Sequence, residues 1–399
     1  MVSTRAPAVV VGLDCITGLQ SARILSGHGV PVIGLVNDAR SFAARTRSCT
    51  QVRQCDLLGE GFVEELERLG PRLPSKAVLV PCTDLTVQLI SLHRDQLAPW
   101  YHVLLPKHEA VQLLLDKASF LQHALDHGLA VPRTVLVRGR SDAEHAAQTL
   151  TFPCVLKPPV KTPLWQASTA AKVIRVGTAA ELLQAYDRVR GWADVLVAQE
   201  WVVGGEDSLY SCNAYFDRSS RPLVTFVARK LRQWPVDTGT SCLGEECRND
   251  EVRAETVRLF GSVNFHGLAY LEMKRDERTG RHYIIEPNVG RPTGRSAIAE
   301  AGGVDLLYAA YCDATGEPLP AGLVQRFTGV KWIDDRRDLQ AAIQHLWKRE
   351  LTPRQWWRSV SGPKAHAVWS VSDPLPFVLD LAQTARKAVS RLAQLARRP

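Results

Sequence analysis

The sequence lacks three features that would place it in a membrane or in an oxidising compartment. Its longest apolar runs, such as residues 8–13, have the length of a strand and not that of a membrane-spanning helix. No leader with basic, apolar and small-residue regions precedes the first of these runs. The nine cysteines form no C-x-x-C pair, and no histidines accompany them at zinc-site spacing. We therefore expect a cytoplasmic protein whose cysteines are buried, reduced thiols.

Several functional signatures are missing as well. Gly12 and Gly18 match the glycine fingerprint of dinucleotide sites only loosely, because their spacing is not G-x-G-x-x-G. No basic patch is interleaved with aromatic residues, so no nucleic-acid partner is expected. The eleven histidines show no Ser-His-Asp or Cys-His arrangement. These absences argue against a nucleic-acid-binding protein and an enzyme with a covalent nucleophile, and they weaken the case for a nicotinamide-dependent oxidoreductase.

The chain has the composition of a globular enzyme with an excess of positive charge. Its 399 residues, 23% charged and 45% hydrophobic, suffice for two or three domains with large cores. A polyanionic ligand would explain part of the net charge of +8. Another part is local, because residues 385–398 carry five cations and no acid. This tail is interpreted either as a solvated C-terminal helix or as a weak contact with an anionic membrane surface, peripheral at the inner membrane face.

Residues 7 to about 105 alternate between strand and helix signals. Apolar runs at 7–13, 30–36 and 77–81 are typical of buried strands. Thr17 and Thr83 are expected to cap the helices that follow the first and the third run. This alternation predicts a parallel sheet with helices on both faces.

The most informative segment is a predicted β-hairpin. Residues 267–274 and 282–288 contain the aromatic and aliphatic side chains typical of strands, and a glycine lies in the connection between them. With the turn centred on Thr279, Glu272 of the first strand stands directly opposite Glu286 of the second. The hairpin therefore brings two carboxylates together on one face.

This pair of acids points to a metal site. Like charges opposite each other destabilise a sheet, so Glu272 and Glu286 need a compensating cation. Asn288 lies two residues beyond Glu286 and emerges on the same face. Carboxylate and amide oxygens are ligands that hard divalent cations accept. The alternative is two solvated glutamates on an ordinary hairpin.

Cations near other strands point to an anionic ligand. Lys157 ends the apolar strand 152–158 between prolines, and a buried lysine is rare without an anionic partner. Arg291 and Arg295 follow the hairpin and precede a helix, and arginine is suited to bidentate recognition of carboxylate or phosphate. We expect these side chains to contact phosphate or carboxylate groups.

These motifs together resemble those of the ATP-grasp superfamily. The hairpin residues Glu272 and Glu286-Pro287-Asn288 are similar to the superfamily's metal signature, particularly in the branch of predicted carboxylate–amine ligases related to biotin carboxylase and D-aspartate ligase. The strand 152–158 and the segment 195–207, a buried strand leading to a polar hinge and two acids, resemble its nucleotide-binding elements. The resemblance extends from the first strand to about residue 315.

The resemblance implies an α/β protein in three parts. Residues 1–105 are expected to form a parallel Rossmann-like (pre-ATP-grasp) domain. Residues 106–320 are expected to form a two-lobed ATP-grasp α+β domain with the nucleotide and metal site. Residues 321–399, which are rich in tryptophan and contain no catalytic motif, are expected to form helices that pack on the main body and end in the basic tail.

The resemblance also implies a role for each candidate residue. Mg²⁺ (or Mn²⁺) is expected on Glu272, Glu286 and Asn288. ATP is expected to contact the following residues: Lys117, Lys157, Gln199, Glu200, Trp201, Val202, Glu206 and Asp207. The γ-phosphate and the acyl phosphate are expected to contact Lys230, Arg291 and Arg295.

The implied activity is ATP-dependent, ADP-forming ligation of a small-molecule carboxylate to an amine through an acyl phosphate. The chain departs from the superfamily in the loop at 159–169, which contains none of the usual glycines, and in the position of Arg291, shifted by one residue. A non-catalytic ATP-binding or scaffold protein is therefore an alternative, and a nicotinamide-dependent oxidoreductase is a less favoured one. The residues leave the two substrates and the oligomeric state open.

Overall fold

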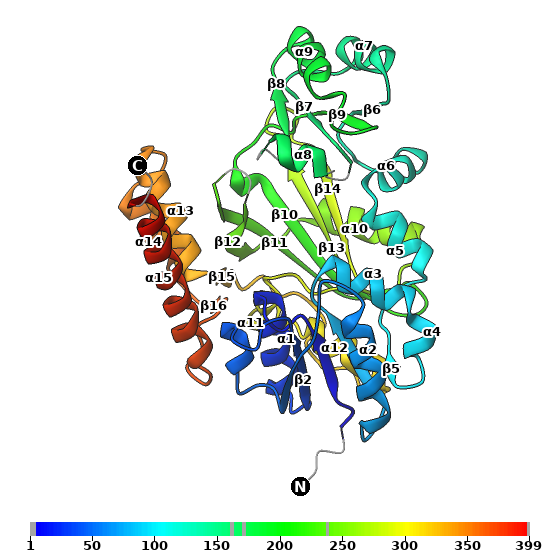
Figure 1. The fold of residues 1–399 in the computed structure, drawn as a ribbon, viewed down its shortest axis with the longest axis vertical. Coiled ribbons are helices and arrows are strands. Elements are labelled where there is room, and N and C mark those ends of the chain that lie inside the picture. Colours follow the sequence, from blue (N-terminus) through cyan, green and yellow to red (C-terminus); the bar gives the residue numbers. More distant parts are fainter. Residues whose placement is uncertain (1–4, 160–162, 170–172, 237–238, 397–399) are drawn as a thin grey trace.

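The computed structural model describes residues 5–159, 163–169, 173–236 and 239–396 and arranges them around three sheets (Figure 1). The first sheet is parallel, with the order β3-β2-β1-β4-β5. Its strands are β1 (Ala8–Val11), β2 (Val32–Val36), β3 (Gln51–Gln54), β4 (Ala77–Pro81) and β5 (Tyr101–His102). Its helices are α1 (Ile16–Gly27), α2 (Gly61–Leu69), α3 (Asp84–Leu92) and α4 (Arg94–Leu97), with short 3-10 turns at Phe42–Arg45 and Gly70–Arg72. The predicted parallel sheet is confirmed.

The helix caps of this sheet confirm one expectation and correct another. Thr83 caps α3, and its hydroxyl accepts a hydrogen bond from the Thr86 amide. The expectation that Thr17 caps α1 is wrong, because the thiol of Cys15 accepts from the Gly18 amide instead. A Cβ on Gly18 would lie 2.2 Å from the carbonyl oxygen of Gly12. Glycine at position 18 thus lets α1 pack closely after β1 and begin at residue 16.

A small antiparallel sheet forms the upper lobe in Figure 1, with the order β6-β9-β7-β8. Its strands are β6 (Thr134–Val137), β7 (Cys154–Lys157), β8 (Ile174–Val176) and β9 (Leu196–Glu200). Three helices belong to this lobe: α7 (Arg140–Thr149), α8 (Pro163–Ser168) and α9 (Ala179–Val189). The lobe has its own apolar core, which includes Leu156 and Trp165. Two helices, α5 (His108–Leu115) and α6 (Lys117–Asp126), connect it to the first sheet.

The large sheet occupies the middle of the molecule, with the order β14-β13-β10-β11-β12-β15-β16. Its strands are β10 (Leu209–Phe216), β11 (Pro222–Trp234), β12 (Thr240–Glu246), β13 (Gly267–Arg275), β14 (His282–Val289), β15 (Lys331–Ile333) and β16 (Lys364–His366). The associated helices are α10 (Asp250–Ser262), α11 (Ala297–Ala301) and α12 (Leu306–Thr315), with a 3-10 turn at Glu206–Ser208. One core joins this sheet to the first sheet, with Val9 and Leu79 in the same cluster as Phe216 and Leu271.

The hairpin of β13 and β14 has the predicted register at its acids. Glu272 pairs with Glu286, and Asn288 pairs with Tyr270. The register shifts next to this pair, because Met273 pairs with Ile284 and leaves Ile285 as the extra residue of a bulge. As a result Ile285 and Glu286 are both exposed, although they are neighbours on a strand.

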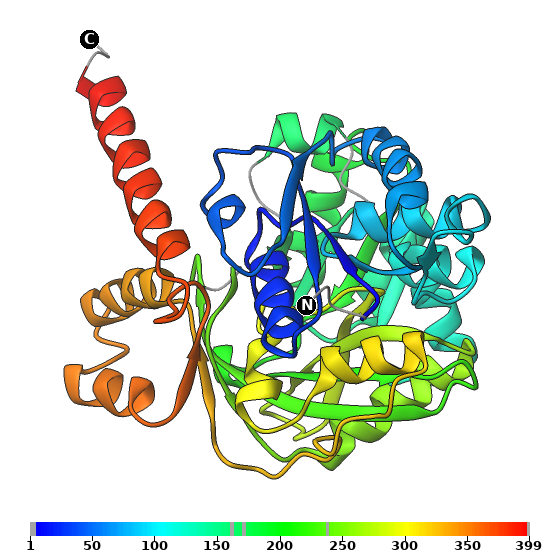
Figure 2. The same ribbon diagram turned by 90° about the horizontal axis from the view of Figure 1, so that it is seen from below.

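The C-terminal region continues the large sheet and then leaves it. After β15 come α13 (Asp335–Trp347) and α14 (Pro353–Val360), and after β16 comes α15 (Leu375–Ala396). Figure 2 shows α15 extending away from the body as one straight helix. None of the helices in the described ranges is long and apolar enough to cross a membrane. The side chains of the basic tail beyond residue 386 lie outside the described residues, and the domain limits at 105 and 320 stay predictions.

Candidate active site

Two cavities meet at the β13–β14 hairpin. The larger, of about 700 Å³, lies between the first sheet, the large sheet and the C-terminal region. The smaller, of about 180 Å³, lies between α5, α6, the small sheet and β14. Glu286 and Asn288 line both cavities, and Glu272 lines the larger one. The predicted metal-binding residues therefore stand where the two spaces join.

The carboxylate of Glu286 is only partly compensated. Its Oε1 lies 3.8 Å from Nζ of Lys117, at the start of α6. Although its side chain is half exposed, partial desolvation raises the pKa of Glu286, and Glu272 and Asp84 raise it further, whereas Lys117 lowers it. A cation between the two glutamates would offset this unfavourable electrostatic environment.

The donor set fits a divalent cation that is shared with phosphate. Within the described ranges, no three His, Cys, Asp or Glu side chains converge as a complete metal site. Here two carboxylates and the amide of Asn288 share one face of the hairpin. Mg²⁺ takes few protein ligands and completes its shell with water and substrate phosphates. These three side chains therefore suit Mg²⁺ in the presence of a polyphosphate.

The smaller cavity has an apolar wall and a cationic end. Nζ of Lys157 donates to Oε1 of Gln199 at 3.2 Å, and Nε2 of Gln199 donates to Oγ1 of Thr134 at 2.9 Å. Burial lowers the pKa of Lys157 to about 8, assisted by Lys117, while Glu286 raises it. The apolar wall consists of Leu114, Leu115, Phe120, Leu121, Val131, Val197, Ile284 and Ile285. Such a cavity can hold a flat ring against its wall and an anion at Lys117 and Lys157.

The side chains of residues 199–202, in the predicted hinge, line two different cavities. Successive side chains of a strand point to opposite faces, so Gln199 faces Lys157 while Glu200 faces away. Oε1 of Glu200 accepts a hydrogen bond of 2.7 Å from the Thr151 amide. Glu200, Trp201 and Val202 line a separate cavity of about 270 Å³. The structure thus brings Gln199, and not the side chains of its three successors, together with Lys157.

The two acids after the hinge lie elsewhere. Oε2 of Glu206 accepts from the Gln233 amide at 3.1 Å and is 3.7 Å from Nε2 of His345. Asp207 is exposed. Neither is among the described side chains that line the two joined cavities. In this arrangement Glu206 helps to hold β11 and α13 together.

Two buried cations in the larger cavity form no ion pair with an acid among the described residues. Lys230 is 6% exposed, and its Nζ donates to Oε1 of Gln233 at 3.2 Å. Arg295 is 5% exposed and donates to the hydroxyls of Ser211 at 2.9 Å and Ser241 at 3.0 Å. Burial lowers the pKa of both groups. Because buried charges are costly unless paired, these two cations are suited to an anionic ligand.

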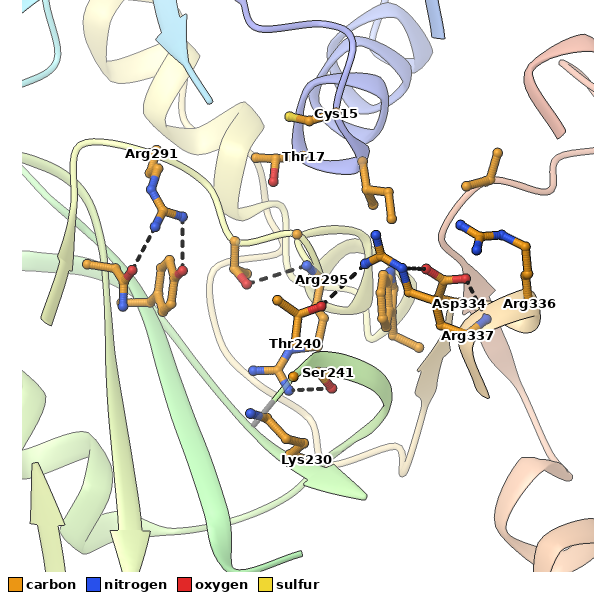
Figure 3. A pocket seen from close by; sticks show the side chains of 18 of the residues that line it. Cys15, Thr17, Lys230, Thr240, Ser241, Arg291, Arg295, Asp334, Arg336 and Arg337 are labelled. Carbon is orange, nitrogen blue, oxygen red and sulfur yellow. Dashed lines mark hydrogen bonds and ion pairs between the residues drawn. The ribbon is translucent and has the colours of Figure 1, made fainter. Parts of the chain in front are cut away.

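Arg291, in contrast, already donates to three protein groups. Its guanidinium donates to Asp84 at 2.6 Å, to the hydroxyl of Tyr270 at 2.9 Å and to Oδ1 of Asn288 at 2.7 Å. Burial lowers the pKa of Arg291, but Tyr270 and Asp84 raise it above its usual value. Arg291 thus positions Asn288, whereas Arg295 lies closer to Lys230 and Ser241 in Figure 3.

Sequence reasoning missed the contribution of the C-terminal region. The larger cavity is also lined by Trp332, Asp334, Arg336, Arg337, Val368 and Asp380. Figure 3 shows Asp334, Arg336 and Arg337 across the cavity from Arg291, with Arg295 between them. No motif marks these residues, because their position depends on how β15 joins β12.

Comparisons with known proteins agree on the fold. No family model matches the chain. A D-aspartate ligase from Enterococcus faecium is 22% identical over 250 residues, covering 59% of both chains. A D-alanine–D-alanine ligase from Methylococcus capsulatus is 26% identical over 196 residues, covering 45% of this chain and 58% of that protein. The chain thus spans about three fifths of the length of these curated relatives.

Solved structures match over more of the chain. Biotin carboxylase from Campylobacter jejuni, in a complex with β-γ-ATP, has a TM-score of 0.64 at 13% identity, and the match covers 81% of this chain and 74% of that one. N5-carboxyaminoimidazole synthetase from Staphylococcus aureus, in two structures of which one is complexed with ADP, has a TM-score of 0.62 at 16% identity, and the match covers 80% of both chains. These likenesses establish the fold class.

Proposed function

We propose that this chain, an ATP-grasp protein by its fold, is an ADP-forming ligase that joins a small-molecule carboxylate to an amine. One observation carries the proposal: Glu286 and Asn288 belong to the walls of two cavities with different chemistry. One cavity has an apolar wall and two lysines, and the other has two buried cations with no acid partner in the described chain. A phosphoryl group passing from one cavity to the other would cross at the glutamate pair.

ATP would occupy the smaller cavity with its base against the apolar wall. Lys157 and Lys117 would then lie near the phosphates, as would Glu286 at the junction. Gln199 is the hinge side chain that faces this space. For Trp201 and Val202 we propose backbone contacts, since their side chains line another cavity.

Glu272, Glu286 and Asn288 would hold Mg²⁺ (or Mn²⁺). When bound, the ion would neutralise charge on the β- and γ-phosphates. Arg291 keeps the Asn288 side chain in place by donating to its oxygen. These residues act by positioning and electrostatics, which dominate phosphoryl transfer.

The acceptor carboxylate would lie in the larger cavity. One of its oxygens attacks the γ-phosphorus, the bond to ADP breaks, and an acyl phosphate forms. Lys230 and Arg295 would face the negative charge on this species, and neither forms an ion pair with an acid of the described chain. The amine nitrogen then attacks the acyl carbon, inorganic phosphate leaves, and the nitrogen loses a proton. No side-chain nucleophile is required.

The names of two relatives, D-aspartate ligase and D-alanine–D-alanine ligase, refer to amino acids. We accordingly propose that at least one substrate of this chain is a small carboxylic or amino acid. The test is ADP release from ATP and Mg²⁺ over a matrix of acids and amines. ADP release is expected to require one acid and one amine, and each ADP should be accompanied by one inorganic phosphate. Formation of AMP, or tight ATP binding without turnover across the matrix, would contradict the proposal.

A further inference from the structure

The C-terminal region forms a wall of the larger cavity, and this wall carries two arginines. Arg336 and Arg337 lie in the first turn of α13. Figure 3 shows their guanidinium groups on the side of the cavity nearest to Asp334. Across from this wall stand Cys15 and Thr17, at the start of α1.

A buried ion pair fixes the orientation of α13. Asp338 is 1% exposed and accepts from Nε of Arg232 at 2.7 Å and from Nη2 at 3.2 Å. The indole of Trp356 donates to the same carboxylate at 3.1 Å. Because Asp338 faces β11, the residues one and two positions earlier on a helix face elsewhere. This geometry directs Arg336 and Arg337 to the cavity side.

A second network fixes the C-terminal region to the first sheet's domain. Asp373 is 3% exposed and accepts from Nε of Arg23 at 3.0 Å, from the hydroxyl of Thr46 at 2.5 Å and from the Arg47 amide at 3.2 Å. Arg23 also donates to the carbonyl oxygen of Val368 at 2.8 Å. The C-terminal region is therefore held in a fixed position as one wall of the larger cavity.

Each arginine of the wall uses only part of its hydrogen-bonding capacity. Nε of Arg336 donates to Asp380 at 3.1 Å. Nε of Arg337 lies 3.4 Å from Asp334, and its Nη1 donates to Thr240 at 3.3 Å. A guanidinium has five N–H donors, so both groups retain donors for a ligand.

Trp332 lines the same space but offers it no donor. Its side chain is 2% exposed, and its indole Nε1 is enclosed by protein. The two guanidinium groups are therefore the donors that this wall presents to a ligand.

We propose that Arg336 and Arg337 bind a carboxylate that one substrate carries in addition to its reacting group. The inference rests on the proposed function and narrows it to substrates with a second anionic group. Each guanidinium already shares its charge with one aspartate, Asp380 or Asp334. Because the two aspartates balance this charge, a ligand meets the unused N–H donors of a neutral cluster, which suit a single carboxylate better than a dianionic phosphate ester.

The extra carboxylate has two sources. It belongs either to a dicarboxylic acid that is phosphorylated at its other end, or to an amino acid that supplies the amine. The probes are therefore succinate, glutarate and a set of amino acids, each compared with its amide, in which one carboxylate is replaced. Binding is measured by calorimetry in the presence of ADP and Mg²⁺, so that no turnover is needed.

The wild-type protein is expected to bind at least one carboxylate probe more tightly than its amide. The double variant Arg336→Gln/Arg337→Gln is expected to bind that probe about tenfold or more weakly, since charge-assisted bonds are lost, with no change for the amide. Arg336→Lys/Arg337→Lys retains charge without the planar fork and is expected to give an intermediate loss. Arg354→Gln, on the exposed surface of α14, is the matched control and is expected to match wild type.

Melting temperature and affinity for MgADP report whether each variant keeps its fold and nucleotide site. Equal affinity of wild type for every carboxylate and its amide would overturn the inference. So would an unchanged carboxylate affinity in both double variants, or tighter binding of inorganic phosphate at these arginines. If carboxylate binding follows the expected pattern while no acid–amine pair releases ADP, the ligase proposal fails and the subsite stands.

Discussion

The electrostatic neighbours of Glu286 have opposite effects: Lys117 at 3.8 Å lowers its pKa, and the facing Glu272 raises it. Replacing its carboxylate by an amide keeps the size of the side chain and removes one anionic ligand. Glu286→Gln is expected to keep the fold and to lower Mg²⁺-dependent ADP release. The loss should exceed the roughly 10–100-fold that follows when a residue supporting a metal ligand is removed, because Glu286 would itself be a ligand. A coupled ADP assay at saturating ATP, with a titration of Mg²⁺, measures this.

The control for this substitution is Glu109→Gln, which makes the same change on the exposed side of α5. It is expected to keep wild-type turnover and the wild-type Mg²⁺ dependence. Wild-type turnover in Glu286→Gln would rule out the metal-binding role.

The affinity for nucleotide is expected to depend on pH through Lys157, because burial lowers the pKa of this lysine to about 8. Below that pH the free protein already carries the ammonium that a phosphate needs. Above it, nucleotide binding must also take up a proton, so affinity is expected to fall by up to about tenfold per pH unit. Lys157→Arg is expected to remove this fall, because arginine stays charged. Calorimetric titration of ADP at constant ionic strength across this range measures both.

Lys157→Ala is expected to weaken ADP binding by about 1.5–3 kcal/mol at neutral pH and to make it independent of pH above 8. Lys107→Ala, an exposed lysine that precedes α5, is the matched control. Equal ADP affinity in Lys157→Ala and wild type would assign Lys157 a structural role.

At the scale of elements, the bulge in β14 and the ion pair on α13 decide what faces the cavities. The bulge puts the apolar Ile285 beside Glu286 on the exposed face, where regular alternation would separate them. Ile285 lines the smaller cavity together with Val197. One strand thus supplies both an apolar wall and a metal ligand.

The pair of Arg232 and Asp338 holds α13 against β11, with side chains that are 6% and 1% exposed. Asp338→Ala leaves the guanidinium buried and uncompensated, which is expected to cost about 3–5 kcal/mol of unfolding free energy. Urea unfolding measures the loss. The double variant Arg232→Met/Asp338→Leu is expected to recover most of it, because apolar residues can replace a buried ion pair.

Asp335→Ala provides the comparison on the same helix. Asp335 pairs with His366 in a half-exposed position, where ion pairs contribute little, so a loss below about 1 kcal/mol is expected. Similar losses for the two aspartate variants would mean that the Arg232 pair does not fix α13.

At the scale of the molecule, α15 has two halves with different duties. Its first half holds the cavity wall formed by the C-terminal region. Asp380 accepts a hydrogen bond from Arg336, and Gln383 donates to the carbonyl oxygen of Arg40 at 2.7 Å. Its second half extends from the body in Figure 2. Deletion of residues 384–399 is expected to leave the melting temperature and ADP release unchanged.

The same deletion is expected to abolish co-sedimentation with anionic liposomes, because each cation near such a surface contributes about 1 kcal/mol. Deletion of residues 375–399 removes Asp380 as well and is expected to lower the melting temperature. If the shorter deletion lowers the melting temperature by several degrees, the tail belongs to the core and the membrane contact is excluded.

The features that depend on the local order of residues were predictable without the structure. Alternation along two adjacent strands with a short turn set Glu272 against Glu286, and the structure confirms that register. Uninterrupted apolar runs followed by capped helices predicted the parallel first sheet, because both faces of such a sheet are buried. The same local pattern predicted Lys157 at the end of its strand.

Which of these residues line the same cavity depends on how the three sheets pack together. Gln199 and Glu200 are neighbours in sequence, yet they face different cavities because the small sheet fixes the direction of each side chain. Arg336 and Arg337 reach the larger cavity because Asp338 and Asp373 pair with residues more than a hundred positions away, Arg232 and Arg23. Contacts of that separation depend on the packing of whole elements, and no local pattern in the chain records them.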